Sequence, residues 1–180
     1  MKGAEILAGK AIINSINLED GEERFADILP LVKQFGGALV VGTIDEEGWQ
    51  SPRQKAGRRR PVASAAHRKY GIPASDIIFD PLVFPVGTGD EQYIGSAKET
   101  IEGIRLIKEQ LPECLTILGV SNVSFGLPPV GREILNAVFL YHATQAGLDY
   151  AIVNTESLSG LLPFLKKKSR WLKTSVSYRR

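Results

Sequence analysis

The fold class is decided by residues 115–153, which read LTILGVSNVSFGLPPVGREILNAVFLYHATQAGLDYAIV. The opening LTILGV is a short aliphatic run of the kind that forms a buried strand. Residues 132–146 are apolar on nearly every side and are followed by Gly147, which predicts a helix and its end. Residues 150–153 (YAIV) predict another strand. The stretch is therefore a strand, helix and strand in succession.

The same alternation continues toward the N-terminus. Three earlier strands are predicted at residues 10–16 (KAIINSI), 38–43 (ALVVGT) and 77–80 (IIFD). Gly36 ends a predicted helix between the strands at 10–16 and 38–43. A second helical stripe follows residue 80 and consists of Ile94, Ala97, Ile101, Ile104, Ile107 and Leu111. The strands do not alternate polar with apolar residues, so both of their faces should be buried. The predicted fold class is α/β, with a parallel sheet or barrel covered by helices.

The composition is that of one globular domain. The chain has 180 residues, of which 43% are hydrophobic and 23% charged, enough for an ordinary core. It contains no apolar run of membrane-spanning length and no secretory signal, so we expect a cytoplasmic protein without a membrane partner. The single cysteine, Cys114, can form neither an internal disulfide nor a structural zinc site, and we expect it in the core.

The net charge of +2 conceals an uneven distribution. Residues 48–75 and 157–180 each hold seven Lys or Arg and no acidic residue, which leaves eight basic residues against all 20 acidic ones elsewhere. Basic blocks can bind polyanions, so a nucleic-acid-binding protein is an alternative to weigh. These blocks carry few aromatic residues, and the chain has no helix-turn-helix or ribonucleoprotein motif, so we do not expect nucleic acid as a partner.

Amide and acidic residues stand where the predicted strands end. They are Asn14, Asp45, Asp80, Asn122 and Asn154. Ligands of α/β folds bind at the carboxyl ends of parallel strands, which makes these residues candidate ligand contacts. An amide both donates and accepts hydrogen bonds and an ionised carboxylate accepts them, so together they suit a heterocycle such as a pterin. Any one of them could instead cap the following helix.

Other catalytic arrangements are not found in the sequence. There are no paired histidines, no Ser-His-Asp set and no HExxH, which indicates a site that works by hydrogen bonding. We predict that His142, inside the apolar helix, is a packed histidine and not a base, and we assign no role to His67. The three acids of residues 45–47 are typical of a solvated loop, so we predict no metal site.

Four motifs together resemble a known family. They are GVSNVSFGLPPVGR at residues 119–132, AGLDYAIVN at 146–154, IINSINLEDGEE at 12–23 and DIIFDPLVFPVGTG at 76–89. In their order along the chain, these motifs resemble the pterin-binding domain of cobalamin-dependent methionine synthases and of their corrinoid methyltransferase relatives. The resemblance covers about residues 9–47 and 70–157, and it implies a dihydropteroate synthase-like (β/α)8 barrel. About five of its βα units are present here.

The resemblance also implies a function. Such a domain binds 5-methyltetrahydrofolate and presents its N5-methyl group to cobalamin carried on a separate module, in the synthesis of methionine from homocysteine. Folate and a cobalamin-binding domain or corrinoid protein are therefore the expected partners. The alternatives are a stand-alone corrinoid-protein methyltransferase, a dihydropteroate synthase, whose late basic motifs we do not find, and an inactive barrel fragment. Whether the chain alone is an active methyltransferase stays open.

Specific residues match the motifs of that family. Asp80 resembles the carboxylate that reads the N–H groups of the pterin ring, and Asn122 resembles the amide nearest N5, which makes it the expected catalytic residue. Gly119 is expected to let the ring approach the backbone, and Arg132 resembles the loop arginine beside the folate. The remaining expected substrate contacts are Asn14 and, from residues 45–47, Asp45.

Two features depart from the family. Residues 49–69 and 158–180 have the composition of sequence read in another frame, and we interpret them as the product of frame changes. The first three of eight barrel strands have no counterpart, so we expect an upstream fragment as a partner that completes the barrel. The expected domains are a partial pterin-binding barrel at residues 1–157 and a basic tail at 158–180, either aberrant or disordered.

Overall fold

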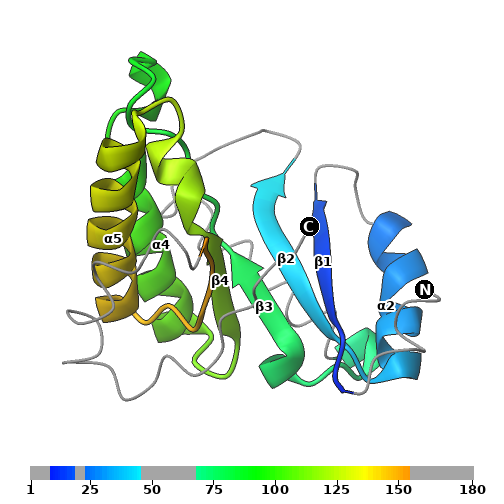
Figure 1. Ribbon diagram of the computed structural model, residues 1–180. Helices are drawn as coiled ribbons and strands as arrows, with labels where there is room; N and C mark the ends of the chain where they lie inside the picture. Colours follow the sequence, from blue (N-terminus) through cyan, green and yellow to red (C-terminus); the bar gives the residue numbers. More distant parts are fainter. Residues whose placement is uncertain (1–8, 19–22, 46–67, 155–180) are drawn as a thin grey trace.

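The computed structural model describes residues 9–18, 23–45 and 68–154. Five strands form one parallel sheet whose spatial order follows the chain, β1-β2-β3-β4-β5 (Figure 1). They are β1 (Ile12–Leu18), β2 (Ala38–Asp45), β3 (Ile77–Asp80), β4 (Leu115–Gly119) and β5 (Tyr150–Ile152). The predicted α/β class is thus confirmed.

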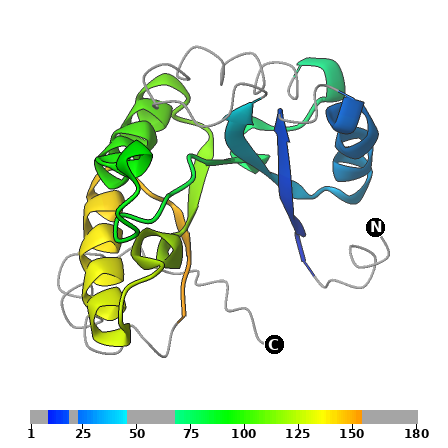
Figure 2. The ribbon, with the colours of Figure 1, turned by 90° about the horizontal axis from the view of Figure 1, so that it is seen from above.

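Helices connect the strands on one side of the sheet. They are α2 (Glu23–Phe35) between β1 and β2, α4 (Ser96–Gln110) between β3 and β4, and α5 (Pro129–Gln145) between β4 and β5. Three short 3-10 turns complete the elements: η1 (Ala74–Asp76), η2 (Glu91–Tyr93) and η3 (Val120–Ser124). Seen along the strands, the sheet is an arc with the helices on its outer side, which is the curvature of part of a barrel (Figure 2).

Both faces of the sheet carry buried apolar side chains. On the helix side, Leu39 and Phe79 belong to a core cluster with α2 residues such as Leu29. On the opposite face, Val40 and Ile78 belong to a separate cluster. Neighbouring residues of one strand therefore point into two different apolar environments. This arrangement explains why the strands read as unbroken apolar runs.

Several element boundaries differ from the predicted ones. β1 continues to Leu18, so Asn14 lies inside the strand and not at its end, in a region where the pairing with β2 shifts register between Ile13 and Ile16. α5 begins at Pro129 and not at Arg132, because a proline in the first helical turn needs no N–H partner and already has a helical φ.

The predicted helical stripe before β4 is shorter than expected. Ile94 is 81% exposed and precedes the helix, because Gly95 adopts a left-handed backbone with φ 83° and α4 starts only at Ser96. Cys114, in contrast, is 1% exposed, which confirms its place in the core. No helix among the described residues is long and apolar enough to cross a membrane.

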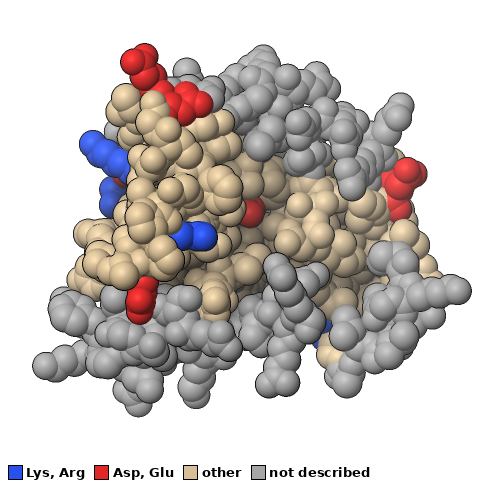
Figure 3. All heavy atoms as spheres, turned by 45° about the horizontal axis from the view of Figure 1, so that its top comes forward, with Lys and Arg blue, Asp and Glu red and all other residues tan. Residues whose placement is uncertain are grey.

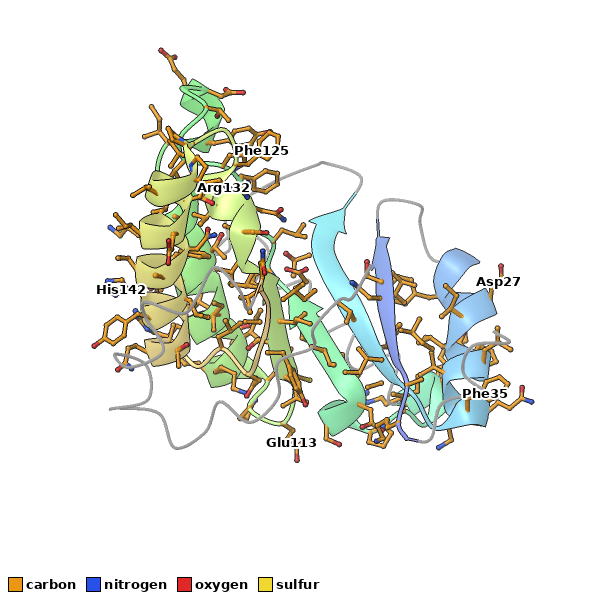
Figure 4. All side chains as sticks on the ribbon, in the orientation of Figure 1. Asp27, Phe35, Glu113, Phe125, Arg132 and His142 are labelled. Carbon is orange, nitrogen blue, oxygen red and sulfur yellow. The ribbon has the colours of Figure 1, made fainter. Side chains whose placement is uncertain are left out.

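One prediction about α5 is wrong. His142 is exposed and projects from the outer side of the helix (Figure 4). Val130, Ile134 and Val138, at intervals of four residues, are 71%, 58% and 49% exposed, and His142 continues this row. The apolar surroundings of His142 in the sequence predicted a packed side chain, but only the opposite side of α5, with residues such as Leu140, packs against the sheet.

Candidate functional site

The parallel strands bring the candidate residues of β3 and β4 to the same edge of the sheet. Asp80 is the last residue of β3 and pairs with Gly42 of β2, while Gly119 is the last residue of β4. Asn122 follows immediately in η3. Figure 3 views the molecule with this edge turned forward, and the surface is hollowed near its centre, where acidic atoms are visible.

Asp80 places at this edge a carboxyl group whose pKa is close to neutral pH. Its side chain is only partly exposed, and its Oδ1 accepts a hydrogen bond of 2.9 Å from the Leu82 backbone N–H. Burial raises the pKa of Asp80 to about 6, against the opposing effect of that hydrogen bond. At neutral pH the group is therefore largely an ionised acceptor, and it needs only a modest change of environment or pH to become a donor.

Asn122 presents an exposed amide beside Gly119. A Cβ atom added to Gly119 would lie 3.3 Å from the Asn122 Nδ2, so a side chain at position 119 would crowd the amide. The Asn122 carbonyl accepts a 3.2 Å hydrogen bond from the Phe125 N–H, which fixes the backbone of the turn. Glycine at position 119 therefore leaves room for the Asn122 amide. This is a second reason for a glycine there, besides the predicted approach of a ring to the backbone.

The Arg132 side chain donates hydrogen bonds to two other residues of the chain. From the first turns of α5, its Nε donates to the Ser124 hydroxyl and its Nη2 donates to the Ser121 carbonyl, each at 3.2 Å. The Ser124 hydroxyl in turn donates to the same carbonyl at 3.1 Å. Arg132 and Phe125 lie close together at the upper end of the molecule (Figure 4). Arg132 thus holds the turn that carries Asn122, and its contact with folate stays a prediction.

The loops after β3 and β4 are joined to each other. The Val86 N–H donates to the Val123 carbonyl at 3.0 Å. A Cβ atom on Gly87 would lie only 2.6 Å from the Leu127 Cδ2, so the two loops approach each other closely at a glycine. The segments that follow Asp80 and Asn122 consequently form one connected surface next to the strand ends.

The other predicted residues are placed less completely. Asn14 is exposed in the irregular part of β1, and Asn154 is exposed two residues beyond β5. Asp45 is the last residue of β2, as expected, but its side chain lies outside the described residues. His67, residues 48–67 of the first basic segment (48–75) and the whole of the second, 157–180, also lie outside the described residues. Within the described parts of the chain, no group of three His, Cys, Asp or Glu could hold a metal ion.

Sequence reasoning missed the side chains that fix these loops. The Thr100 hydroxyl of α4 donates to the Leu82 carbonyl, and the Ser124 hydroxyl accepts from Arg132. A serine or threonine forms so many kinds of local hydrogen bond that its type alone gives no signal of such a contact.

The sequence of the chain is similar to those of known proteins. Residues 2–154 match the family described as pterin binding enzyme. The chain is 42% identical over 160 residues to the methionine synthase of Mycobacterium tuberculosis (strain ATCC 25618 / H37Rv). It is 40% identical over 160 residues to the methionine synthase of Mycobacterium leprae (strain TN). Each match covers 87% of this chain but only 13% of the relative, so the chain spans a small part of the length of these proteins.

Proposed function

Because the chain belongs to the pterin-binding enzyme family, we propose that it binds 5-methyltetrahydrofolate and positions the N5-methyl group for transfer. The acceptor is cobalamin carried on a separate module, and the transfer is one step in making methionine from homocysteine. The observation that carries the proposal is the placement of a partly buried carboxylate, Asp80, and an exposed amide, Asn122, after neighbouring strands at one edge of a parallel sheet.

Asp80 would recognise the pterin ring. The ring carries neighbouring N–H groups, and an ionised carboxylate can accept from two of them at once. The hydrogen bond from Leu82 leaves the Asp80 carboxylate in a defined direction, so the ring would be bound in one orientation. Ring N–H donors stabilise the charged form of Asp80, and bound folate should therefore lower the pKa of this group.

Asn122 would act on the reacting nitrogen. The methyl group leaves with cleavage of its C–N bond, and the electron pair of that bond stays on N5, which is a poor leaving group unless it is protonated. The amide oxygen of Asn122 can accept a hydrogen bond from protonated N5 and stabilise that form without ionising itself. A contact that strengthens as the bond breaks accelerates the step, whereas one that is equal in the ground state improves only binding.

The methyl acceptor needs an open approach to this edge. Cobalamin in its reduced state supplies a nucleophilic metal centre that takes the methyl group. Asn122 is exposed and Phe125 is 63% exposed, so the strand-end surface is accessible to a group carried on another module. This accessibility is what a cofactor shared between modules requires.

We also propose that further strands outside this chain complete the barrel. In the described residues the sheet has five strands, with β1 and β5 at its two edges, whereas a closed barrel of this type has eight. The inner face already carries an apolar cluster that includes Ala38 and Ile117. Residues 1–157 would form the barrel part of this chain and residues 158–180 its basic tail.

Methyl transfer can be followed directly. The purified chain, mixed with 5-methyltetrahydrofolate and reduced cobalamin, should produce tetrahydrofolate and a methylated cobalamin in equal amounts, which the cobalamin absorption spectrum reports. The strands that complete the barrel should increase the rate. If neither preparation transfers methyl groups, although both are folded, the proposed reaction is wrong.

A further inference from the structure

The turn after β3 has an uncommon backbone. Leu82 has φ 62°, in the left-handed region that residues other than glycine rarely adopt. Its N–H donates to Asp80 Oδ1 at 2.9 Å, and its carbonyl accepts from Thr100 Oγ1 at 2.8 Å. Both polar groups of Leu82 are thus bonded, one to the candidate pterin contact and the other to helix α4.

Thr100 is placed to hold this turn. It is 1% exposed, on the side of α4 that faces the loop, and its bond to Leu82 joins residues 18 apart in the sequence. Its hydroxyl also lies 3.0 Å from the Ser96 carbonyl, four residues earlier in the same helix. A hydroxyl has a single proton to donate, and the contact with Leu82 is the shorter of the two.

Thr144 on α5 shows the ordinary arrangement. Its hydroxyl donates to the Leu140 carbonyl at 2.8 Å, four residues back within its own helix. Bonds of this kind are common for threonine in helices and do not involve another segment. Thr100 differs because its hydroxyl reaches out of α4 to the loop of the site.

We propose that Thr100 is a positioning residue of the pterin site. Its hydroxyl keeps Leu82 in the left-handed conformation, from which the Leu82 N–H orients the Asp80 carboxylate toward the bound ring. The identity of the bound ring in this inference rests on the proposed function. The positioning of the Asp80 carboxylate by Thr100 does not rest on it, because that positioning can be measured without a ligand.

Substitution by valine separates the hydroxyl from the shape of the side chain. Thr100→Val keeps the branched shape but cannot donate, whereas Thr100→Ser keeps the donor. If the free energy of this one partly buried hydrogen bond is lost from the bound state, the affinity for 5-methyltetrahydrofolate becomes about tenfold weaker. We expect this loss in Thr100→Val and near wild-type affinity in Thr100→Ser. Thr144→Val, the matched control, should leave the affinity unchanged.

The second measurement follows the Asp80 carboxyl by NMR titration of the chain without folate. Burial raises the pKa of Asp80 to about 6 although the Leu82 hydrogen bond lowers it, so a carboxyl that loses this bond while it stays buried should titrate above about 6. Thr100→Val should show this upward shift, and Thr100→Ser and Thr144→Val should not. A general loss of stability would not move the titration of a chain that is still folded.

The two measurements distinguish the possible outcomes. If wild-type chain does not bind 5-methyltetrahydrofolate, the proposed function fails, while the Asp80 titration still decides whether Thr100 positions the carboxylate. If Thr100→Val leaves the Asp80 titration as in the wild type, the inference is overturned. Should this variant fail to fold, Thr100→Ala removes the same hydroxyl with a smaller side chain and is judged by the same titration.

Discussion

Replacing Asp80 by asparagine should stabilise the chain at neutral pH while removing pterin binding. Burial raises the pKa of Asp80 from 3.8 to about 6. The folded chain therefore binds this proton more tightly than the unfolded chain does. The resulting stabilisation is fully present below the unfolded pKa and is lost as the pH rises through the folded pKa. The two values correspond to a loss of up to about 3 kcal/mol between pH 4 and pH 8.

Asparagine avoids this loss because it does not ionise. Its Oδ1 can still accept the 2.9 Å hydrogen bond from the Leu82 N–H, so the turn after β3 should persist. The asparagine amide presents one oxygen and one N–H₂ group to the ring in place of two acceptor oxygens. A ring N–H group would then face a donor, which should weaken 5-methyltetrahydrofolate binding by about 100-fold.

Urea unfolding at pH 4 and at pH 8, followed by circular dichroism, measures the effect on stability. The other carboxyl groups are common to both proteins, so the difference between variant and wild type isolates Asp80. We expect a difference near zero at pH 4 and an advantage of about 2 to 3 kcal/mol for Asp80→Asn at pH 8.

Asp149→Asn is the matched control, with the opposite expected sign. Asp149 Oδ2 accepts hydrogen bonds from the Thr116 N–H at 2.9 Å and from Lys108 Nζ at 3.0 Å, so its replacement should destabilise the chain at pH 8. A difference between Asp80→Asn and wild type that is the same at both pH values would refute the reasoning, as would a less stable Asp80→Asn at pH 8.

Three further variants test the site and its support. Asn122→Ala should slow methyl transfer by about 100-fold in single-turnover assays and change folate affinity by less than about threefold, and equal losses would identify Asn122 as a binding contact only. Arg132→Met should lower the thermal midpoint and the transfer rate together by releasing η3, whereas Arg105→Met, at an exposed pair with Glu102, should change neither. Gly147→Ala should cost about 1 to 2 kcal/mol in urea unfolding, since Gly147 has φ 106° and an added Cβ would lie 2.9 Å from the Lys108 Cγ of α4. An unchanged midpoint for Gly147→Ala would show that this turn adapts.

The positions of the strands were predictable because the apolar runs that form them are visible in the sequence. β3 occupies residues Ile77–Asp80, as predicted, since a run of apolar residues with two buried faces is followed by Pro81, which cannot donate to a ladder. The parallel order of the strands then places Asp80 and Gly119 at one edge without further information. The local motif around Asn122 likewise gave its position next to β4.

Properties that depend on distant neighbours were not predictable. Helical periodicity shows which residues of α5 are apolar, but it does not show which side of the helix has a neighbour, and His142 was therefore wrongly assigned to the interior. The hydrogen bond from Thr100 to the Leu82 carbonyl joins residues 18 apart in the sequence, and Leu82 has a left-handed conformation. No propensity or spacing rule indicates such a contact. The extension of β1 to Leu18, which places Asn14 within the strand, and the register shift beside Asn14 both arise in the pairing with β2.

The central claim is that the amide and carboxylate at the strand ends hold a reduced pterin ring. Calorimetric titration of the folded chain, together with the strands that complete its barrel, tests this claim most directly. We predict one bound 5-methyltetrahydrofolate per chain, no binding of p-aminobenzoylglutamate, which lacks the pterin, and loss of folate binding in Asp80→Asn. Equal affinity for both compounds, or no heat of binding with either, would contradict the claim.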